Sequence, residues 1–175
     1  MRQPPPFAQT VCAADYAFPW DNLIGAFKFQ GRTELATVFA ARMVAAWRHA
    51  QGPLPQLLLP IPLAPARLAE RGYNQAWELA RRAGRAVGVA ACADLLLRPL
   101  DTAQQADLNR AERQRNLRSA FMVEPRQRQR LQGLHVALVD DVMTTGATAR
   151  EAAAVLLRSG AATVDVWVLA RTPEH

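Results

Sequence analysis

Lysine is almost absent from this chain. Lys28 is the only one, and the other twenty of the 21 basic residues are arginines, a skew that genomic base composition alone can produce. Cysteine is scarce too: Cys12 and Cys92 are the only two, and they lie far apart in the sequence. Two cysteines exclude a disulfide-rich scaffold, and with three scattered histidines they outline no four-ligand zinc site. We therefore interpret both cysteines as reduced, partly buried thiols.

Long apolar runs are missing as well. No run reaches the roughly 18–20 residues that cross a bilayer. The N-terminal stretch MRQPPPFAQTV contains neither a long apolar segment nor a small-residue cleavage site, so we do not interpret it as a signal peptide. Half of the 175 residues are apolar, which is enough for the core of one domain. We expect a single cytoplasmic domain over residues 1–175, with no membrane insertion.

Positive charge is present but unevenly spread. The formal net charge is +6, and residues 98–130 contain eight arginines against four acidic residues. Such a segment favours an anionic ligand, for example phosphate, pyrophosphate or nucleic acid. A solvated helix face explains the same pattern equally well, so the charge alone does not decide between them.

Apolar runs bounded by glycine or proline predict the strands. The main ones cover residues 56–62, 93–100, 135–140 and 163–170, and shorter ones are predicted at 10–18 and 119–123. Helical periodicity predicts three helices, at 33–50, 75–87 and 147–159, and residues 101–119 read as a loop followed by a polar helix. Thr33 and Asn74 are the expected N-caps of the first two helices, and Gly88 and Gly160 the expected ends of the last two. This alternation predicts an α/β domain with a mostly parallel sheet covered by helices on both faces.

The stretch HVALVDDVMTTGATAREAAAVL, residues 135–156, carries the clearest chemical signal. Asp140 and Asp141 end an apolar strand, which is where ligands bind in open α/β sheets. Gly146 permits a tight turn or a close approach, and the following helix directs its N-terminal N–H groups to the same place. Three threonine hydroxyls add donors: Thr144, Thr145 and Thr148. A phosphate site beside an acid pair suits a ribose 5-phosphate, whose hydroxyls would donate to the carboxylates.

Other interpretations of this stretch fit less well. A Walker phosphate loop requires a lysine after the final glycine, and a dinucleotide-binding G-x-G-x-x-G is absent. A phospho-acceptor receiver domain carries its paired acids near the start of the domain and needs a lysine downstream, whereas only 34 residues follow Asp141 and none is lysine. Acids that merely cap the helix 147–159 remain an alternative, although one cap needs only one acid.

The segment VALVDDVMTTGAT resembles the phosphoribosyl pyrophosphate (PRPP) motif of type I phosphoribosyltransferases. Three further stretches resemble blocks of the ComF family, which is associated with competence and the use of external DNA: IGAFKFQGRTELA, LPIPLAPARLAERGYNQAWELA and DTAQQADLNRAERQRNLRSAF. The resemblance extends over nearly the whole chain. It implies a type I phosphoribosyltransferase-like fold, with a core at 55–171 and a small N-terminal hood over 1–30.

The resemblance also implies an activity and its residues. The activity is Mg²⁺-dependent transfer of ribose 5-phosphate from PRPP to an acceptor that no pattern identifies, with Mg²⁺ held through PRPP and water. The implied catalytic residues are Asp140, Asp141 and Arg113. The implied PRPP-binding stretch comprises Asp140, Asp141, Val142, Met143, Thr144, Thr145, Gly146, Ala147 and Thr148, the last five around the 5-phosphate. The candidates for the pyrophosphate wall and for a lid over the site are Lys28, Arg71, Asn74, Gln75, Gln105 and Asn116, with Leu108 at a further matching position.

Several points stay open at this stage. A turn with a helix cap explains RGYNQ as well as a pyrophosphate wall does, and a surface lysine explains Lys28 equally well. ComF proteins often carry an N-terminal four-cysteine zinc ribbon; either this member lacks it or its true start lies upstream, so no zinc-dependent role is carried over. The alternative function is a non-catalytic PRPP-binding or DNA-handling accessory protein of the uptake machinery, whose partner would be single-stranded DNA or a protein. A homodimer is a family-level expectation.

Overall fold

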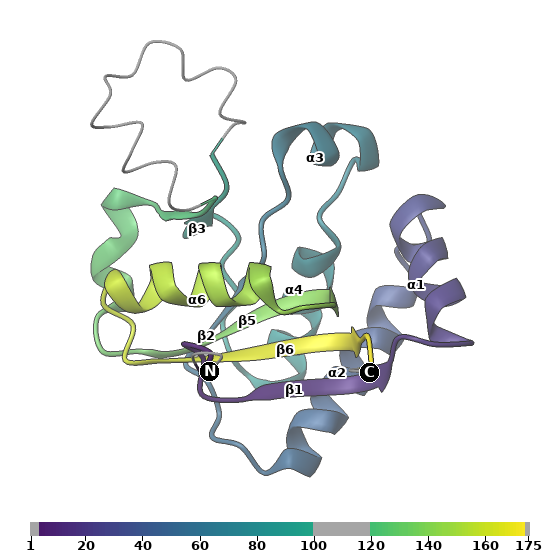
Figure 1. Cartoon of the computed structure of the whole chain (residues 1–175), viewed down its shortest axis with the longest axis horizontal. Coiled ribbons are helices and arrows are strands. Elements are labelled where there is room, and N and C mark those ends of the chain that lie inside the picture. Colours follow the sequence, from purple (N-terminus) through teal and green to yellow (C-terminus); the bar gives the residue numbers. More distant parts are fainter. Residues whose placement is uncertain (1–3, 100–119, 174–175) are drawn as a thin grey trace.

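The main sheet contains four parallel strands in the order β1-β6-β5-β2 (Figure 1). The structure is a computed structural model that describes residues 4–99 and 120–173. The strands are β1 (Thr10–Asp15), β2 (Leu57–Pro60), β5 (His135–Met143) and β6 (Thr163–Arg171). Parallel strands are buried on both faces, which is why β2 and β6 read as nearly continuous apolar runs. The predicted mostly parallel sheet is confirmed.

Two apolar layers cover the sheet. Val136 and Leu138 of β5 pack on one face against α6 (Ala147–Arg158), while the alternating Ala137 and Val139 belong to the other layer. That second layer contains side chains of α1 (Trp20–Phe29), α2 (Leu35–Ala50) and α4 (Gln75–Val87). In Figure 1, α6 lies in front of the sheet and α2 and α4 behind it, while α1 lies beyond the carboxyl ends of the strands. The prediction of helices on both faces is also confirmed.

The helix caps were predicted with mixed success. Asn74 caps α4 as expected, because its Oδ1 accepts hydrogen bonds from the backbone N–H groups of Ala76 (2.9 Å) and Trp77 (3.3 Å). Gly88 ends the same helix with φ +72°, a conformation that favours glycine. Thr33 is not the N-cap of the helix predicted at 33–50. That helix, α2, begins at Leu35, and within the described residues its N-cap Glu34 forms no side-chain cap hydrogen bond.

The predicted strand 93–100 is mostly wrong. Within the described residues 93–99, the strand is limited to β3 (Leu96–Leu97), which pairs antiparallel with β4 (Met122–Val123) in a separate two-stranded sheet. The apolar side chains of this run are buried against the α6 layer, so their burial does not need a place in the main sheet. Sequence reasoning also missed three helices: α1, α3 (Pro65–Arg71) and the 3₁₀ helix η2 (Pro125–Leu131). In the described parts of the chain, no helix combines the length and apolar character needed to span a membrane.

A buried polar network connects β5, β6 and Gln9 at the amino-terminal ends of the strands. The Asp165 side chain on β6 is buried; its Oδ2 accepts a hydrogen bond from Gln9 Nε2 (2.6 Å) and lies 2.8 Å from His135 Nε2 on β5. Removing the shared acceptor would leave two partly buried polar groups without it.

We therefore expect Asp165→Ala to lower the free energy of unfolding by about 1–3 kcal/mol. Urea unfolding followed by circular dichroism measures this change. The matched control is Glu34→Ala, which removes an exposed ion pair with Arg32 and should change stability by less than about 0.5 kcal/mol. Equal stabilities for the two variants would contradict the assigned role of the network.

Candidate functional site

The two acids lie where the sheet edge forms a step. The pairing of β2 with β5 ends at Pro60 opposite Val139, whereas β6 stays paired with β5 as far as Met143 opposite Arg171. Asp140 and Asp141 therefore lie just beyond the end of β2, at the carboxyl edge of the sheet. This is the position at which open α/β sheets bind ligands.

The side chains of the two acids diverge from one another. Successive residues of a strand point to opposite faces, and Asp140 lines a pocket on the α6 side. The Asp141 side chain is only 9% exposed, and its Oδ2 lies 3.0 Å from Lys28 Nζ of α1. Each carboxylate also accepts a backbone hydrogen bond, Asp140 Oδ1 from the N–H of Asp141 (2.9 Å) and Asp141 Oδ1 from the N–H of Val142 (2.8 Å).

The two carboxylates still repel one another despite this divergence. Burial and the neighbouring Asp141 carboxylate together raise the pKa of Asp140 well above its usual range, and the more distant Lys28 ammonium only partly opposes them. A raised pKa means that the charged form of this carboxyl is unfavourable in the folded protein. Hydrogen-bond donors supplied by a ligand would relieve that cost.

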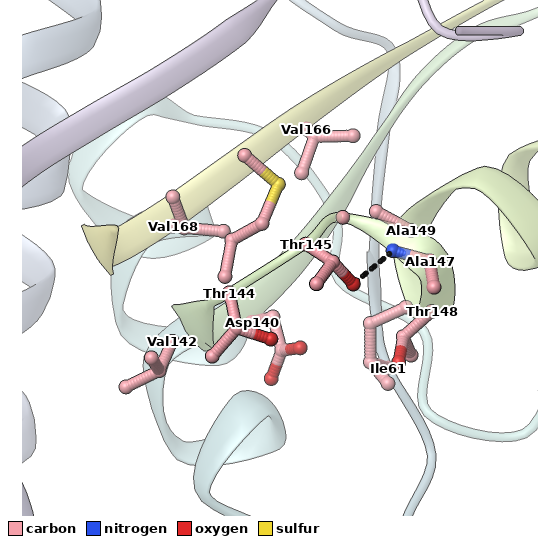
Figure 2. A pocket seen from close by; sticks show the side chains of 12 residues that line it. Ile61, Asp140, Val142, Thr144, Thr145, Ala147, Thr148, Ala149, Val166 and Val168 are labelled. Carbon is pink, nitrogen blue, oxygen red and sulfur yellow. Dashed lines mark hydrogen bonds between the residues drawn. The ribbon is translucent and has the colours of Figure 1, made fainter. Parts of the chain in front are cut away.

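The turn after β5 and the start of α6 form the rest of the pocket, which Figure 2 shows from close by. Gly146 has φ +74° and is the N-cap residue of α6; within the described residues, its position provides no side-chain cap. The Thr145 hydroxyl accepts a hydrogen bond from the Ala147 N–H (3.3 Å), drawn as the dashed line in Figure 2. The next N–H groups of the first turn of α6 have no intrahelical partner, so they are suited to an anion. The pocket residues are Ile61, Asp140, Val142, Met143, Thr144, Thr145, Gly146, Ala147, Thr148, Ala149, Val166 and Val168.

Most of the predicted PRPP-binding stretch thus comes together around one pocket. Asp141 is the exception, since it lies behind the strand against Lys28. Lys28 was a candidate for the pyrophosphate wall, and the structure places it on the acid pair. Its side chain is 19% exposed, so it is not a freely solvated surface lysine.

The turn at 71–75 is engaged within the protein. The Arg71 Nη1 donates to Gln75 Oε1 (3.0 Å), and the Asn74 Nδ2 donates to the Ile61 carbonyl (3.1 Å). The Gln75 side chain is buried, and its Nε2 has no hydrogen-bond partner among the residues that the structure describes. A ligand or water could satisfy that donor. The turn and cap interpretation of RGYNQ therefore holds for Asn74, while the pyrophosphate prediction for Arg71 and Gln75 stays a prediction.

Sequence reasoning overlooked Tyr73, in the middle of the same turn. The Tyr73 hydroxyl donates a hydrogen bond to the Phe27 carbonyl of α1, and the two rings lie 5.9 Å apart. Burial raises the pKa of Tyr73 further above neutral pH. The signal available in the sequence was the pair of aromatic residues around Lys28, in FKF, of which Phe27 is buried and Phe29 is exposed.

The remaining predicted site residues lie outside the described part of the chain. These are Gln105, Leu108, Arg113 and Asn116. The arginines of η2 are described, and two of them are used internally: Arg128 donates to the Ser159 carbonyl (3.4 Å), and Arg130 to Gln127. Part of the basic segment 98–130 is therefore structural.

A divalent cation fits this site only with help from a ligand. Across residues 4–99 and 120–173, no group of three or more His, Cys, Asp or Glu side chains could hold a metal ion by itself. Mg²⁺ is commonly bound through one or two carboxylates together with substrate phosphates and water. The acid pair at the strand end suits that mode, with Asp140 as the residue open to the pocket.

Comparison with known proteins identifies the family. A protein from Salmonella typhi named DNA utilization protein YhgH is 39% identical over 176 residues, covering 98% of this chain and 76% of that protein. Competence protein F from Haemophilus influenzae is 33% identical over 175 residues, with the same two coverages. The chain belongs to the ComF family. Competence protein ComFC from Bacillus subtilis, a further ComF relative, is 32% identical over 152 residues, covering 83% of this chain and 57% of that protein. No family model matches the chain.

Solved structures show the fold of this ComF-family protein. The glutamine PRPP amidotransferase from B. subtilis, complexed with ADP and GMP, matches with a TM-score of 0.52 at 19% identity, covering 76% of this chain and 26% of that one. A structure described as the allosteric regulatory enzyme of purine biosynthesis gives the same score and identity, covering 76% and 25%. The chain therefore has the type I phosphoribosyltransferase fold, as its sequence predicted.

Proposed function

We propose that this ComF-family protein is a Mg²⁺-dependent phosphoribosyltransferase, which binds PRPP and transfers ribose 5-phosphate to an acceptor that is not yet identified. One observation carries the proposal: the Asp140 carboxylate and the start of α6 face the same pocket. A carboxylate that accepts from sugar hydroxyls and a helix start that binds phosphate are the two features that a ribose 5-phosphate requires. The type I phosphoribosyltransferase fold supports the same assignment.

The residues of the pocket would share the work of binding. The N–H groups at the start of α6 and the hydroxyls of Thr144 and Thr148 would hold the 5-phosphate, since the positive end of the helix dipole favours an anion. Asp140 would accept from a ribose hydroxyl, which replaces repulsion by Asp141 with a charge-assisted hydrogen bond. Mg²⁺, when bound through PRPP and water, would neutralise pyrophosphate charge.

Transfer breaks the bond between sugar C1 and a pyrophosphate oxygen, and the acceptor forms a new bond to C1 and loses a proton. The sugar passes through a state with positive charge at C1. The negative potential of Asp140 and Asp141 favours that developing charge, and exclusion of water protects it from hydrolysis. The predicted contributions of Arg113, Gln105 and Asn116 would lie at the departing pyrophosphate.

Calorimetric titration with PRPP and Mg²⁺ tests the site. Replacing both acids, as Asp140→Asn with Asp141→Asn, removes two charged acceptors and should weaken PRPP binding by at least about 100-fold. Equal binding by the wild type and the double variant would refute the site assignment. A screen of nucleobases and amines for pyrophosphate release from PRPP then tests transfer and identifies the acceptor.

A second candidate is a PRPP-binding accessory protein without transfer activity. The names of the relatives favour it, because they refer to DNA utilization and competence and not to a transferase. PRPP binding without pyrophosphate release for any acceptor would support it. Single-stranded DNA binding that weakens steeply with salt would further indicate a DNA-handling role.

A further inference from the structure

The single lysine of the chain lies at the acid pair. Everywhere else the chain uses arginine for its basic residues, yet the cation beside Asp141 is Lys28. We propose that Lys28 is a positioning residue: its ammonium is the counter-ion that holds Asp141, and the turn at 71–73 fixes Lys28 in that place. The inference rests on the proposed function, because the acid pair is taken to be the ribose site.

The turn holds the chain on both sides of Lys28. On one side, the Tyr73 hydroxyl donates to the carbonyl of Phe27, whose ring is fully buried. On the other side, the Arg71 guanidinium lies over the ring of Phe29, 5.1 Å from its centroid. Two residues that flank Gly72 therefore contact the two neighbours of Lys28, with the firmer contact at the buried Phe27 because Phe29 is exposed. A lysine on the last turn of a helix would otherwise sample many rotamers.

The buried aromatic packing extends this clamp into the core. The Phe27 ring packs edge-on against Phe39 of α2, with ring centroids 5.4 Å apart. The end of α1 is thus anchored to the layer that covers the sheet, and Lys28 extends from a fixed point towards Asp141. The contact joins two elements that are 113 positions apart in the sequence, so local propensity does not create it.

An ammonium suits this position better than a guanidinium. The Lys28 Nζ lies 3.0 Å from Asp141 Oδ2, an oxygen that is buried away from solvent. A guanidinium tends to engage both carboxylate oxygens at once in a planar fork. Arginine at position 28 would also compete for Asp141 Oδ1, which accepts from the Val142 N–H.

The charge of Lys28 matters for an anionic substrate. PRPP carries a phosphate and a pyrophosphate, and two uncompensated carboxylates at the end of β5 would repel it. Lys28 offsets one of those charges from the far side of the strand, where it does not occupy the pocket that Asp140 lines. Loss of Lys28 should therefore weaken PRPP binding even without direct contact.

Because the chain has one lysine, amine acylation reports on this ion pair directly. We expect N-hydroxysulfosuccinimidyl acetate to acetylate Lys28 about three- to tenfold faster in Asp141→Asn than in the wild type, because the partly buried ion pair is lost. The chain's α-amine is the internal reference, and mass spectrometry of peptides measures both rates.

The Tyr73→Phe variant keeps the ring but loses the hydrogen-bond donor, and it should raise the acetylation rate of Lys28 about two- to threefold. Tyr16→Phe, the other tyrosine, is the control. Equal Lys28 rates in wild type and Asp141→Asn would overturn the proposal.

Titrations with PRPP test whether Lys28 contributes to PRPP binding. Lys28→Met should weaken binding about 30-fold, because it leaves a buried carboxylate unpaired. Lys28→Arg should weaken it about threefold, since the charge remains but the geometry changes. Arg32→Met, which removes an equal charge from an exposed ion pair nearby, should change binding less than about twofold.

Wild-type affinity in Lys28→Met would overturn the role of Lys28 and leave the proposed function intact if Asp140→Asn still loses binding. If the wild type does not bind PRPP, the proposed function fails, and the acetylation rates alone decide the ion pair.

Discussion

Replacing Asp140 with asparagine is expected to stabilise the protein at neutral pH while weakening PRPP binding. Burial and the Asp141 carboxylate raise the pKa of Asp140, so its ionised form is unfavourable in the folded state. Asparagine keeps the shape and removes the charge, and we expect a gain of about 0.5–2 kcal/mol in the free energy of unfolding. PRPP affinity should fall about 10- to 100-fold, because the charged acceptor for a sugar hydroxyl is lost.

The stability difference between Asp140→Asn and the wild type should depend on pH. In the unfolded chain Asp140 ionises in the usual carboxyl range, whereas in the folded protein it holds its proton to higher pH. Between those two ranges the native state binds more protons, so wild-type stability falls as pH rises. Asp140→Asn lacks this step, and its advantage should disappear at acidic pH, where Asp140 is protonated in both states. Urea unfolding at several pH values measures the difference.

A matched control is available at the same edge of the sheet. Asp15 ends β1 and is exposed, so Asp15→Asn removes the same charge from outside the site and should shift stability by less than about 0.5 kcal/mol. An Asp140→Asn variant that is less stable than the wild type at neutral pH would show that Asp140 contributes to the fold and is not a cost carried for function.

Thr148→Glu is expected to abolish PRPP binding without loss of stability. Thr148 is exposed in the first turn of α6 and lines the pocket. A carboxylate at this end of a helix is favourable by about 0.3–1 kcal/mol, because it interacts with the positive end of the dipole. The same carboxylate would occupy the place of the 5-phosphate and repel it, which should weaken binding by at least about 100-fold.

Thr148→Gln separates charge from size in this experiment. Glutamine has nearly the same volume as glutamate but no charge, so we expect it to weaken PRPP binding by no more than about tenfold. Calorimetric titration and thermal unfolding of both variants give the two readouts. If the two variants bind PRPP equally, the start of α6 does not hold the phosphate.

The centre of the site could be predicted from the sequence because it is local. The strand, the turn at Gly146 and the helix after it follow one another along the chain, and the apolar run, the glycine and the alanine-rich segment each determine one part. The Asn74 cap and the Gly88 end of α4 were predictable for the same reason. Each depends on interactions within a few residues.

The parts that were missed depend on tertiary contacts or on weak local signals. Helix α1 contains Gly25 and follows Pro19, which forms no side-chain cap within the described residues, so its local pattern is poor. Its stability comes from burying Ile24 and Phe27. The contact between Lys28 and Asp141 depends on where that helix is anchored, and no spacing in the sequence encodes it. Thr33 is a residue type favoured at N-caps, but helix α2 begins two positions later, at Leu35.

The two ends of strand β5 differ in how firmly they are held. His135 begins the strand beside a buried carboxylate partner, and from Val136 to Val139 the strand is paired on both sides, whereas beyond Val139 the β2 side has ended. Strand β5 should therefore open first at its carboxyl end. The backbone amides around Asp140 and Asp141 should exchange with solvent well before those near His135. If the proposed function holds, the carboxyl edge would loosen to admit a substrate or release a product, while the opposite edge keeps the sheet in register.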